Sequence, residues 1–242
     1  MYSRIAAGEV VERPVSVVKE TVENALDAGA TEISVALHEG GKLRIVIEDN
    51  GEGMSFDDLP LAVARHATSK IRTVEELETV RSLGFRGEAL ASIAAVSRLE
   101  IRSRKAGEEQ GALLSIEGGR TVRHVPTPCR PGTRISIEDL FYTLPARRKF
   151  LKTAAAEARR VSALVRDLAV AYPAVAFLEQ HDGKQVFSSP GDGDRESLLR
   201  AMWGDPRQAP RTSSGRALDA GFSGAELRMC EAAATNLSLE CW

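Results

Sequence analysis

PVSVVKETVENALDAGATEISVALHEGGKLRIVIEDNGEGM, residues 14–54, contains the strongest local structural signals in the chain. Pro14 suits the first turn of a helix, where its missing N–H would have no partner. Gly29 is a natural C-terminal cap. Between them, apolar residues recur at helical spacing, at Val15, Val18, Val22, Ala25 and Leu26. The pattern predicts an amphipathic helix over about 14–28.

Two segments with alternating apolar residues follow this helix. Residues 33–37 and 43–47 each place an aliphatic side chain at every second position, as a half-buried strand does. The sequence EGGK, residues 39–42, lies between them and favours a tight connection. We therefore expect a β-hairpin directly after the first helix.

The remaining pattern continues as a mixture of helices and strands. It predicts short helices at 57–66 and 73–82, a buried helix at 89–96, strands at 98–103, 111–117, 120–125 and 133–138, an amphipathic helix at 153–172 and a hairpin joining 174–180 to 184–188. The alternation of a doubly wound parallel sheet is missing. We expect an α/β two-layer sandwich, with a mixed, mostly antiparallel sheet and helices on one face.

Composition narrows the class of protein. The chain has 242 residues, of which 43% are hydrophobic and 27% charged, which is ordinary for a globular protein. Three cysteines do not make a disulfide framework, and no apolar run suits a membrane span or a secretory signal. We expect a cytoplasmic protein without membrane contact. Residues 1–205 are predicted to form one domain, and 206–242 an atypical tail that begins as linker.

Charge is unevenly distributed along the chain. Residues 1–60 contain 12 acidic and 5 basic side chains, whereas residues 120–166 contain 11 basic and 3 acidic ones. Charge alone favours a solvated helix surface over a nucleic-acid-binding face as the explanation of the basic segment. If DNA binds there, the candidate contacts are Arg147, Arg148, Lys149, Lys152, Arg159 and Arg160.

Three groups of residues suggest chemistry. Glu20, Asn24 and Asp27 share one face of the predicted helix, where a carboxylate can orient a water and an amide oxygen can bind Mg²⁺. Asp49 follows a strand and precedes two glycines, so it can accept a hydrogen bond from an exocyclic amine. Hydroxyls, lysine and a glycine-rich helix start at 65–70 and 84–90 suit phosphate binding. Taken singly, each group also fits a polar helix face, a tight turn or a flexible loop.

Together and in this order, these groups resemble the motifs of the GHKL (gyrase, Hsp90, histidine kinase, MutL) ATPase superfamily. The segments 4–14 (RIAAGEVVERP), 64–71 (ARHATSKI), 84–93 (GFRGEALASI) and 140–151 (LFYTLPARRKFL) resemble its MutL-type mismatch-repair branch. The resemblance covers about residues 3–204 and implies the Bergerat sandwich fold. It also implies ATP and Mg²⁺ as cofactors, slow hydrolysis that acts as a switch, ATP-dependent homodimerisation, DNA binding mainly to the backbone, and a mismatch-recognition partner of the MutS type.

The resemblance also implies roles for individual residues. Glu20 would be the general base, and Asn24 would coordinate Mg²⁺. Asp49 would bind the adenine amino group beside Thr133. The remaining ATP-binding positions would be Asp27, Gly51, Gly53, Met54, Thr68, Ser69, Lys70, Gly84, Phe85, Arg86, Gly87, Glu88, Ala89 and Leu90.

The sequence departs from the family pattern in two informative places. Thr143-Leu144 stand where the family has Asn-Thr, and residues 206–242 do not resemble the family's second domain, whose lysine contacts the γ-phosphate. A truncated, non-catalytic remnant that binds nucleotide or DNA is therefore the alternative function. A chaperone or a histidine kinase of the same superfamily is a third, which the segments 64–71 and 84–90 argue against.

Overall fold

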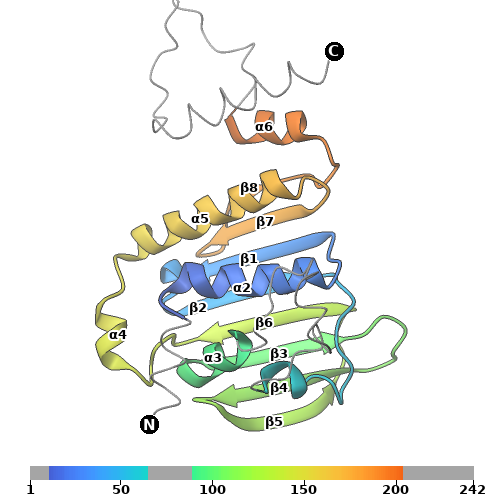
Figure 1. Cartoon of the computed structure of the whole chain (residues 1–242), viewed down its shortest axis with the longest axis vertical. Helices are drawn as coiled ribbons and strands as arrows, with labels where there is room; N and C mark the ends of the chain where they lie inside the picture. The colour runs from blue at the N-terminus through green and yellow to red at the C-terminus, as the bar shows by residue number, and fades with distance from the viewer. Residues whose placement is uncertain (1–10, 65–88, 204–242) are drawn as a thin grey trace, which may run out of the picture. The chain divides into compact units, whose positions relative to one another are not determined.

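Helices cover one face of an eight-stranded sheet in the computed structural model of the chain, which describes residues 11–64 and 89–203 (Figure 1). The chain divides into two units, Met1–Met202 and Trp203–Trp242, and the sheet belongs to the first. The predicted helix at 73–82, the segment 206–242 and the boundary at residue 205 lie outside the described residues.

The first described helix, α2, spans Pro14–Asp27. Pro14 occupies the first helical position as predicted, and the chain leaves the helix through Ala28 and Gly29, whose φ is +72°. Val18, Val22 and Ala25 are buried on the side that packs against the rest of the molecule. The positions on the other side of the helix are occupied by polar residues.

The sheet has the strand order β5-β4-β3-β6-β2-β1-β7-β8. The only parallel pair in this described sheet is β1 with β7, and all other neighbours are antiparallel. The strands are β1 (Glu32–His38), β2 (Arg44–Asp49), β3 (Arg98–Arg104), β4 (Gly111–Glu117), β5 (Arg120–Thr127), β6 (Gly132–Glu138), β7 (Ala176–His181) and β8 (Lys184–Ser188). The predicted mixed, mostly antiparallel sheet and both predicted hairpins are confirmed.

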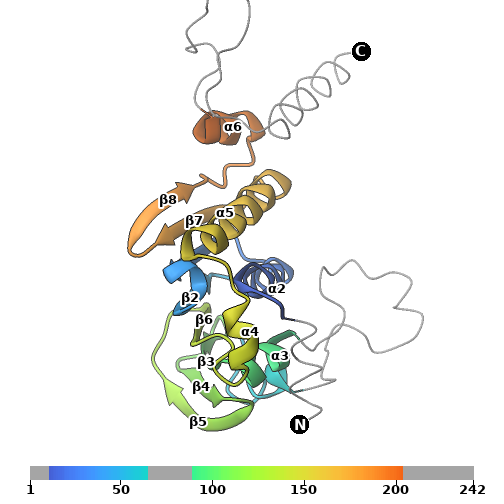
Figure 2. The ribbon, with the colours of Figure 1, turned by 90° about the vertical axis from the view of Figure 1, so that its left-hand side faces the viewer.

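Three helices lie on the same face of this sheet in both views (Figure 1, Figure 2). They are α2, α3 (Ala89–Val96) and α5 (Ala154–Ala171). The Thr153 side chain caps α5 by accepting the Ala156 N–H, and Val161, Val165 and Ala169 of α5 are fully buried. The two-layer sandwich predicted from the sequence is therefore confirmed.

The register of β2, β6 and β3 aligns their inward side chains in cross-strand rows. Ile45, Ile137 and Leu99 form one row, and Ile47, Ile135 and Ile101 form the next. All six side chains are buried, so these rows form the part of the core that the sheet contributes. The following row, two residues further along each strand, is Asp49, Thr133 and Ser103. Because side chains alternate between the two faces of a strand, this polar row points to the same helix-covered face.

Several short elements differ from the sequence prediction. The helix expected over 57–66 is wrong over 57–64, the part of it that the structure describes: only η2 (Leu61–Val63) is helical in 57–64, and it is a 3₁₀ turn. The Ser55 hydroxyl donates to the Asp58 carboxylate and accepts the Asp58 N–H, which favours a turn in place of a helix start. The short helices η1 (Glu39–Gly41), α4 (Pro145–Lys149) and α6 (Arg195–Trp203) were not predicted. Within 11–64 and 89–203, no helix is long and apolar enough to cross a bilayer.

Candidate functional site

The polar row at the end of β2, β6 and β3 is the centre of the candidate site. Asp49 stands opposite Thr133, and Thr133 stands opposite Ser103. The Ser103 hydroxyl lies 3.0 Å from the Thr133 hydroxyl. Three neighbouring strands thus bring a carboxylate and two hydroxyls together next to the last buried aliphatic row.

The Asp49 carboxylate is held by the backbone around it. Its Oδ1 accepts the Gly51 N–H at 2.9 Å. Burial raises the pKa of the Asp49 carboxyl above the ordinary aspartate value, and the N–H groups of Gly51 and Thr133 that donate to the carboxylate oppose this shift. The backbone therefore fixes this half-buried carboxylate in place, as a recognition group must be.

Glycines let the backbone come close on both sides of Asp49. Gly53 has φ +68°, and a Cβ there would lie 2.1 Å from the Arg104 carbonyl oxygen. Gly132 has φ +106°, and its Cβ would lie 2.1 Å from the carbonyl oxygen of Asp49 itself. Neither position accepts a side chain without moving the backbone. The predicted pocket glycine Gly51 is also buried, and its Cβ would meet Ala28 at the end of α2.

Asn50 is a residue of this loop that sequence reasoning passed over. Its Oδ1 accepts the N–H groups of Thr31 and Glu32, at 2.8 and 2.9 Å, and its Nδ2 donates to the Thr31 hydroxyl at 2.9 Å. These bonds attach the loop after β2 to the beginning of β1. An Asn between an Asp and a Gly was a usable signal, because Asn side chains commonly bond nearby backbone in turns.

The helix face predicted from the sequence is present on α2. Glu20 and Asn24 are partly buried and Asp27 is exposed. Glu20 follows Lys19 on this helix, and the Lys19 Nζ forms an ion pair with Glu23 Oε1 at 2.8 Å. The negative charge of Glu20 and that of Glu23 help to raise the pKa of Lys19, after the larger effect of the Lys19–Glu23 hydrogen bond.

A magnesium ion at this face would need oxygen atoms from elsewhere. The described residues contain no group of three or more His, Cys, Asp or Glu side chains that could hold a metal ion alone. Mg²⁺ is usually held by one or two protein oxygens, waters and substrate phosphates. A single amide oxygen, from Asn24, fits that pattern only with a nucleotide bound.

The predicted phosphate-binding segments lie mostly outside the described residues. Thr68, Ser69, Lys70, Gly84, Phe85, Arg86, Gly87 and Glu88 all fall within 65–88. Ala89 and Leu90 begin α3 and are partly buried, and Leu90 packs against the core. Met54 is partly buried next to the polar row, where its N–H donates to the Ser103 hydroxyl at 2.8 Å.

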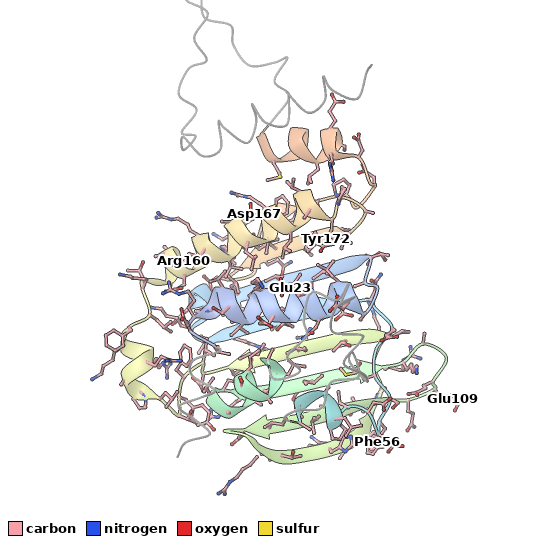
Figure 3. All side chains as sticks on the ribbon, in the orientation of Figure 1. Glu23, Phe56, Glu109, Arg160, Asp167 and Tyr172 are labelled. Atoms are coloured by element: carbon pink, nitrogen blue, oxygen red, sulfur yellow. The ribbon has the colours of Figure 1, made fainter. Side chains whose placement is uncertain are left out.

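The basic residues proposed as DNA contacts differ in how much the fold engages them. Arg147 of α4 donates to the Val11 carbonyl oxygen at 3.0 Å, and its guanidinium lies 5.9 Å from the Phe141 ring centroid. Arg148 lies 3.8 Å from Asp139. Side chains of this group exposed to solvent are Arg148, Lys149, Lys152, Arg159 and Arg160, the last labelled on α5 in Figure 3.

Comparison with known proteins first gives the class. A family model described as "Histidine kinase-, DNA gyrase B-, and HSP90-like ATPase" matches residues 12–129. This range contains α2 and the Asp49 loop. The fold and the site thus define a domain of the GHKL ATPase class.

More similar relatives narrow the class to one family. The DNA mismatch repair protein MutL of Desulforamulus reducens is 53% identical over 84% of this chain and 32% of its own length. The MutL protein of Xanthomonas axonopodis pv. citri is 49% identical over 95% of this chain and 36% of its own. The Aquifex aeolicus MutL ATPase domain complexed with ADP has a TM-score of 0.64 and 32% identity, covering 80% of this chain and 69% of that one. The chain belongs to the MutL family of DNA mismatch repair proteins.

The matches cover most of this chain but only a part of each curated relative. The chain spans about a third of the length of the curated relatives it matches. The 95% coverage by the Xanthomonas relative is too high for that alignment to stop at residue 205, so part of 206–242 aligns with it.

Proposed function

We propose that this chain is the ATP-binding and slowly ATP-hydrolysing domain of a MutL-type mismatch repair protein, with 1–205 as the ATPase domain and 206–242 outside it. The observation that carries the proposal is Asp49, a half-buried carboxylate held by backbone N–H groups beside glycines that leave no room for side chains. The ADP complex of the Aquifex aeolicus relative supports a nucleotide as the ligand.

Asp49 binds the adenine base in this proposal. An ionised carboxylate only accepts hydrogen bonds, and the adenine amino group donates them. Gly51, Gly53 and Met54 line the pocket, and Thr133 contacts the same edge of the base beside Asp49. The glycines support this role because they let neighbouring backbone pack tightly around the loop that holds Asp49 in place.

Glu20 and Asn24 act on the phosphates. Glu20 orients the attacking water and removes its proton, a role that requires a partly solvated carboxylate on a rigid helix. Asn24 would hold Mg²⁺ through its amide oxygen, and the ion would supply positive charge at the phosphates. Asp27, Thr68, Ser69, Lys70 and residues 84–90 complete the ATP-binding set.

Nucleotide binding acts as a switch in this proposal, and it couples mismatch recognition to later repair steps. ATP brings two such domains together, a MutS-type protein is the upstream partner, and DNA contacts the basic residues of 147–160 through its backbone. The exposed cations Lys149, Lys152, Arg159 and Arg160 support DNA contact more strongly than Arg147, whose guanidinium already binds Val11.

Replacing Glu20 by alanine tests the catalytic role. Because a general base contributes about 100- to 10,000-fold to rate, Glu20→Ala should lower ATP turnover by roughly 100-fold or more. ATP affinity should stay within about threefold, since the base acts on water and not on the nucleotide. Phosphate release and equilibrium nucleotide binding are the two measurements.

The matched control is Glu23→Gln, which changes a carboxylate on the same helix that is paired with Lys19. It should leave turnover near the unmodified value. Equal turnover in Glu20→Ala and in the unmodified protein would show that Glu20 is not the base. Mg²⁺-dependent phosphate release that disappears in Asn24→Ala would exclude the non-catalytic alternative.

A further inference from the structure

Ser103 of β3 is the fully buried hydroxyl of the polar row, and the ATPase proposal gives it no role. Three polar atoms surround it. The Met54 N–H donates to Ser103 Oγ at 2.8 Å, the Gly132 carbonyl oxygen lies 3.0 Å from it, and the Thr133 hydroxyl oxygen lies 3.0 Å from it. These atoms belong to the Asp49 loop and to β6.

The direction of each hydrogen bond follows from counting protons. A serine hydroxyl has one proton and two acceptor positions. The Gly132 carbonyl oxygen can only accept, so the Ser103 hydroxyl donates its hydrogen bond to Gly132. The Met54 N–H fills one acceptor position of Ser103 Oγ. The second is left for the Thr133 hydroxyl, which must donate to Ser103 for all three contacts to be hydrogen bonds.

This arrangement determines what Thr133 offers to a ligand. Because the Thr133 hydroxyl donates its one hydrogen bond to Ser103, the Thr133 oxygen presents only acceptor positions to a ligand. Asp49, opposite Thr133 in the same row, is also acceptor-only when ionised. Two adjacent acceptors suit an amino group or a bridging water and repel a carbonyl oxygen.

We infer that Ser103 is a positioning residue that sets the specificity of the site. Because Ser103 accepts the hydrogen bond of the Thr133 hydroxyl, the base pocket accepts a 6-amino purine and rejects a 6-oxo purine. The inference rests on the proposed nucleotide-binding function. Ser103 reaches the base through Thr133 and acts by orienting that hydroxyl.

Binding of ATP and of inosine triphosphate (ITP) tests this inference, because the two differ in the amino or oxo group at this position. In Ser103→Ala, the Thr133 hydroxyl can rotate and donate to the 6-oxo group. The ratio of the ITP and ATP dissociation constants should therefore fall by about tenfold, the value of one hydrogen bond. A merely structural role would weaken both nucleotides equally and leave the ratio unchanged, which would overturn the inference.

Ser189→Ala is the matched control. Ser189 is also buried, accepts the Phe177 N–H at 2.9 Å and donates to the Val175 carbonyl at 3.4 Å, but it lies beside β7 and β8. It should cost similar stability and leave the ratio unchanged. A fall in the ratio as large as that of Ser103→Ala would contradict the inference.

Two further variants separate the possible failures. Ser103→Cys keeps a side chain of similar shape but replaces the hydroxyl oxygen with a weak acceptor for the Thr133 hydroxyl, so it should lower the ratio even if Ser103→Ala folds poorly. In a Thr133→Val background, Ser103→Ala should no longer change the ratio, since the rotating hydroxyl is gone; a change that persists there would overturn the inference. An unmodified chain that binds neither nucleotide contradicts the proposed function, whereas one that binds ATP with a ratio unaffected by Ser103 contradicts only the role of Ser103.

Discussion

Asp49 in β2 and Glu179 in β7 are two carboxylates on the helix-covered face of one sheet, and they have opposite surroundings. Backbone N–H groups hold Asp49 where the apolar rows end and glycines keep side chains away. Glu179 is completely buried under α5, where its Oε1 accepts the Ser162 hydroxyl and the His181 Nε2–H, both at 2.7 Å.

This difference in surroundings matches two different roles, the proposed recognition of a ligand by Asp49 and the packing of the core around Glu179. The backbone N–H groups of Gly51 and Thr133 donate to the Asp49 carboxylate, and in the proposed function a ligand uses its remaining acceptor positions. Side chains from α5 and β7 close over Glu179, and its Oε2 is buried with no hydrogen-bond partner among the residues that the structure describes. In the proposed function, the carboxylate held by backbone groups binds the ligand, and the carboxylate covered by side chains of α5 and β7 packs the core.

The largest expected effect is on stability, at Glu179. Glu179→Ala leaves the Ser162 and His181 donors without their acceptor inside the core, which should lower the free energy of unfolding by about 3 kcal/mol or more. Nucleotide affinity of the folded protein should not change, because none of these residues belongs to the site. Urea unfolding followed by ATP binding measures both. A parallel loss of ATP affinity would break the distinction between the two carboxylates.

The second effect is on binding, at Asp49. Asp49→Ala removes a charged acceptor of the adenine amino group, so ATP affinity should fall by about 10- to 100-fold, the value of a hydrogen bond to a charged group. The free energy of unfolding should change less than in Glu179→Ala, since Asp49 is only partly buried. Titration calorimetry on both variants gives the comparison directly. Unchanged affinity in Asp49→Ala would remove Asp49 from the site.

Local signals explain which parts were predictable. Pro14 and Gly29 mark the ends of α2, and Asp182-Gly183 marks the last hairpin, where both residues have positive φ. These signals lie within a few residues of the structure they specify. The strands followed from alternation alone, so the position of Asp49 and its glycines at the end of a strand could be predicted from the sequence, whereas the register that places Asp49 opposite Thr133 was not predicted.

The missed residues depend on contacts between distant segments. Ser103 acquires its role from Met54 and Thr133, which are 49 and 30 residues away in the sequence. Nothing in the sequence around Ser103 distinguishes it from any serine in a strand. Glu179 was missed for a different reason: its partner Ser162 is only 17 residues away, on α5 directly before β7, but the alternation of a strand does not show that a helix side chain will bond to a buried carboxylate.

The smallest effect concerns pH and again distinguishes Asp49. Because burial raises the pKa of its carboxyl in the folded protein, the folded state binds more protons than the unfolded state between the ordinary aspartate pKa and the raised value. Stability therefore falls as pH rises through that window. Asp49→Asn cannot ionise, so the free energy of unfolding of the unmodified protein should decline relative to the variant over this range and stay parallel to it at higher pH.

Urea unfolding of the two proteins without nucleotide, at several pH values from acid to neutral, measures this difference. Its sign is what matters: a carboxylate stabilised mainly by the N–H groups of Gly51 and Thr133 would have a lowered pKa and would give the opposite slope. A relative gain of stability by the unmodified protein with rising pH would mean that the backbone donors outweigh burial. Asp49 would then be held as a satisfied structural group, and its contrast with Glu179 would disappear.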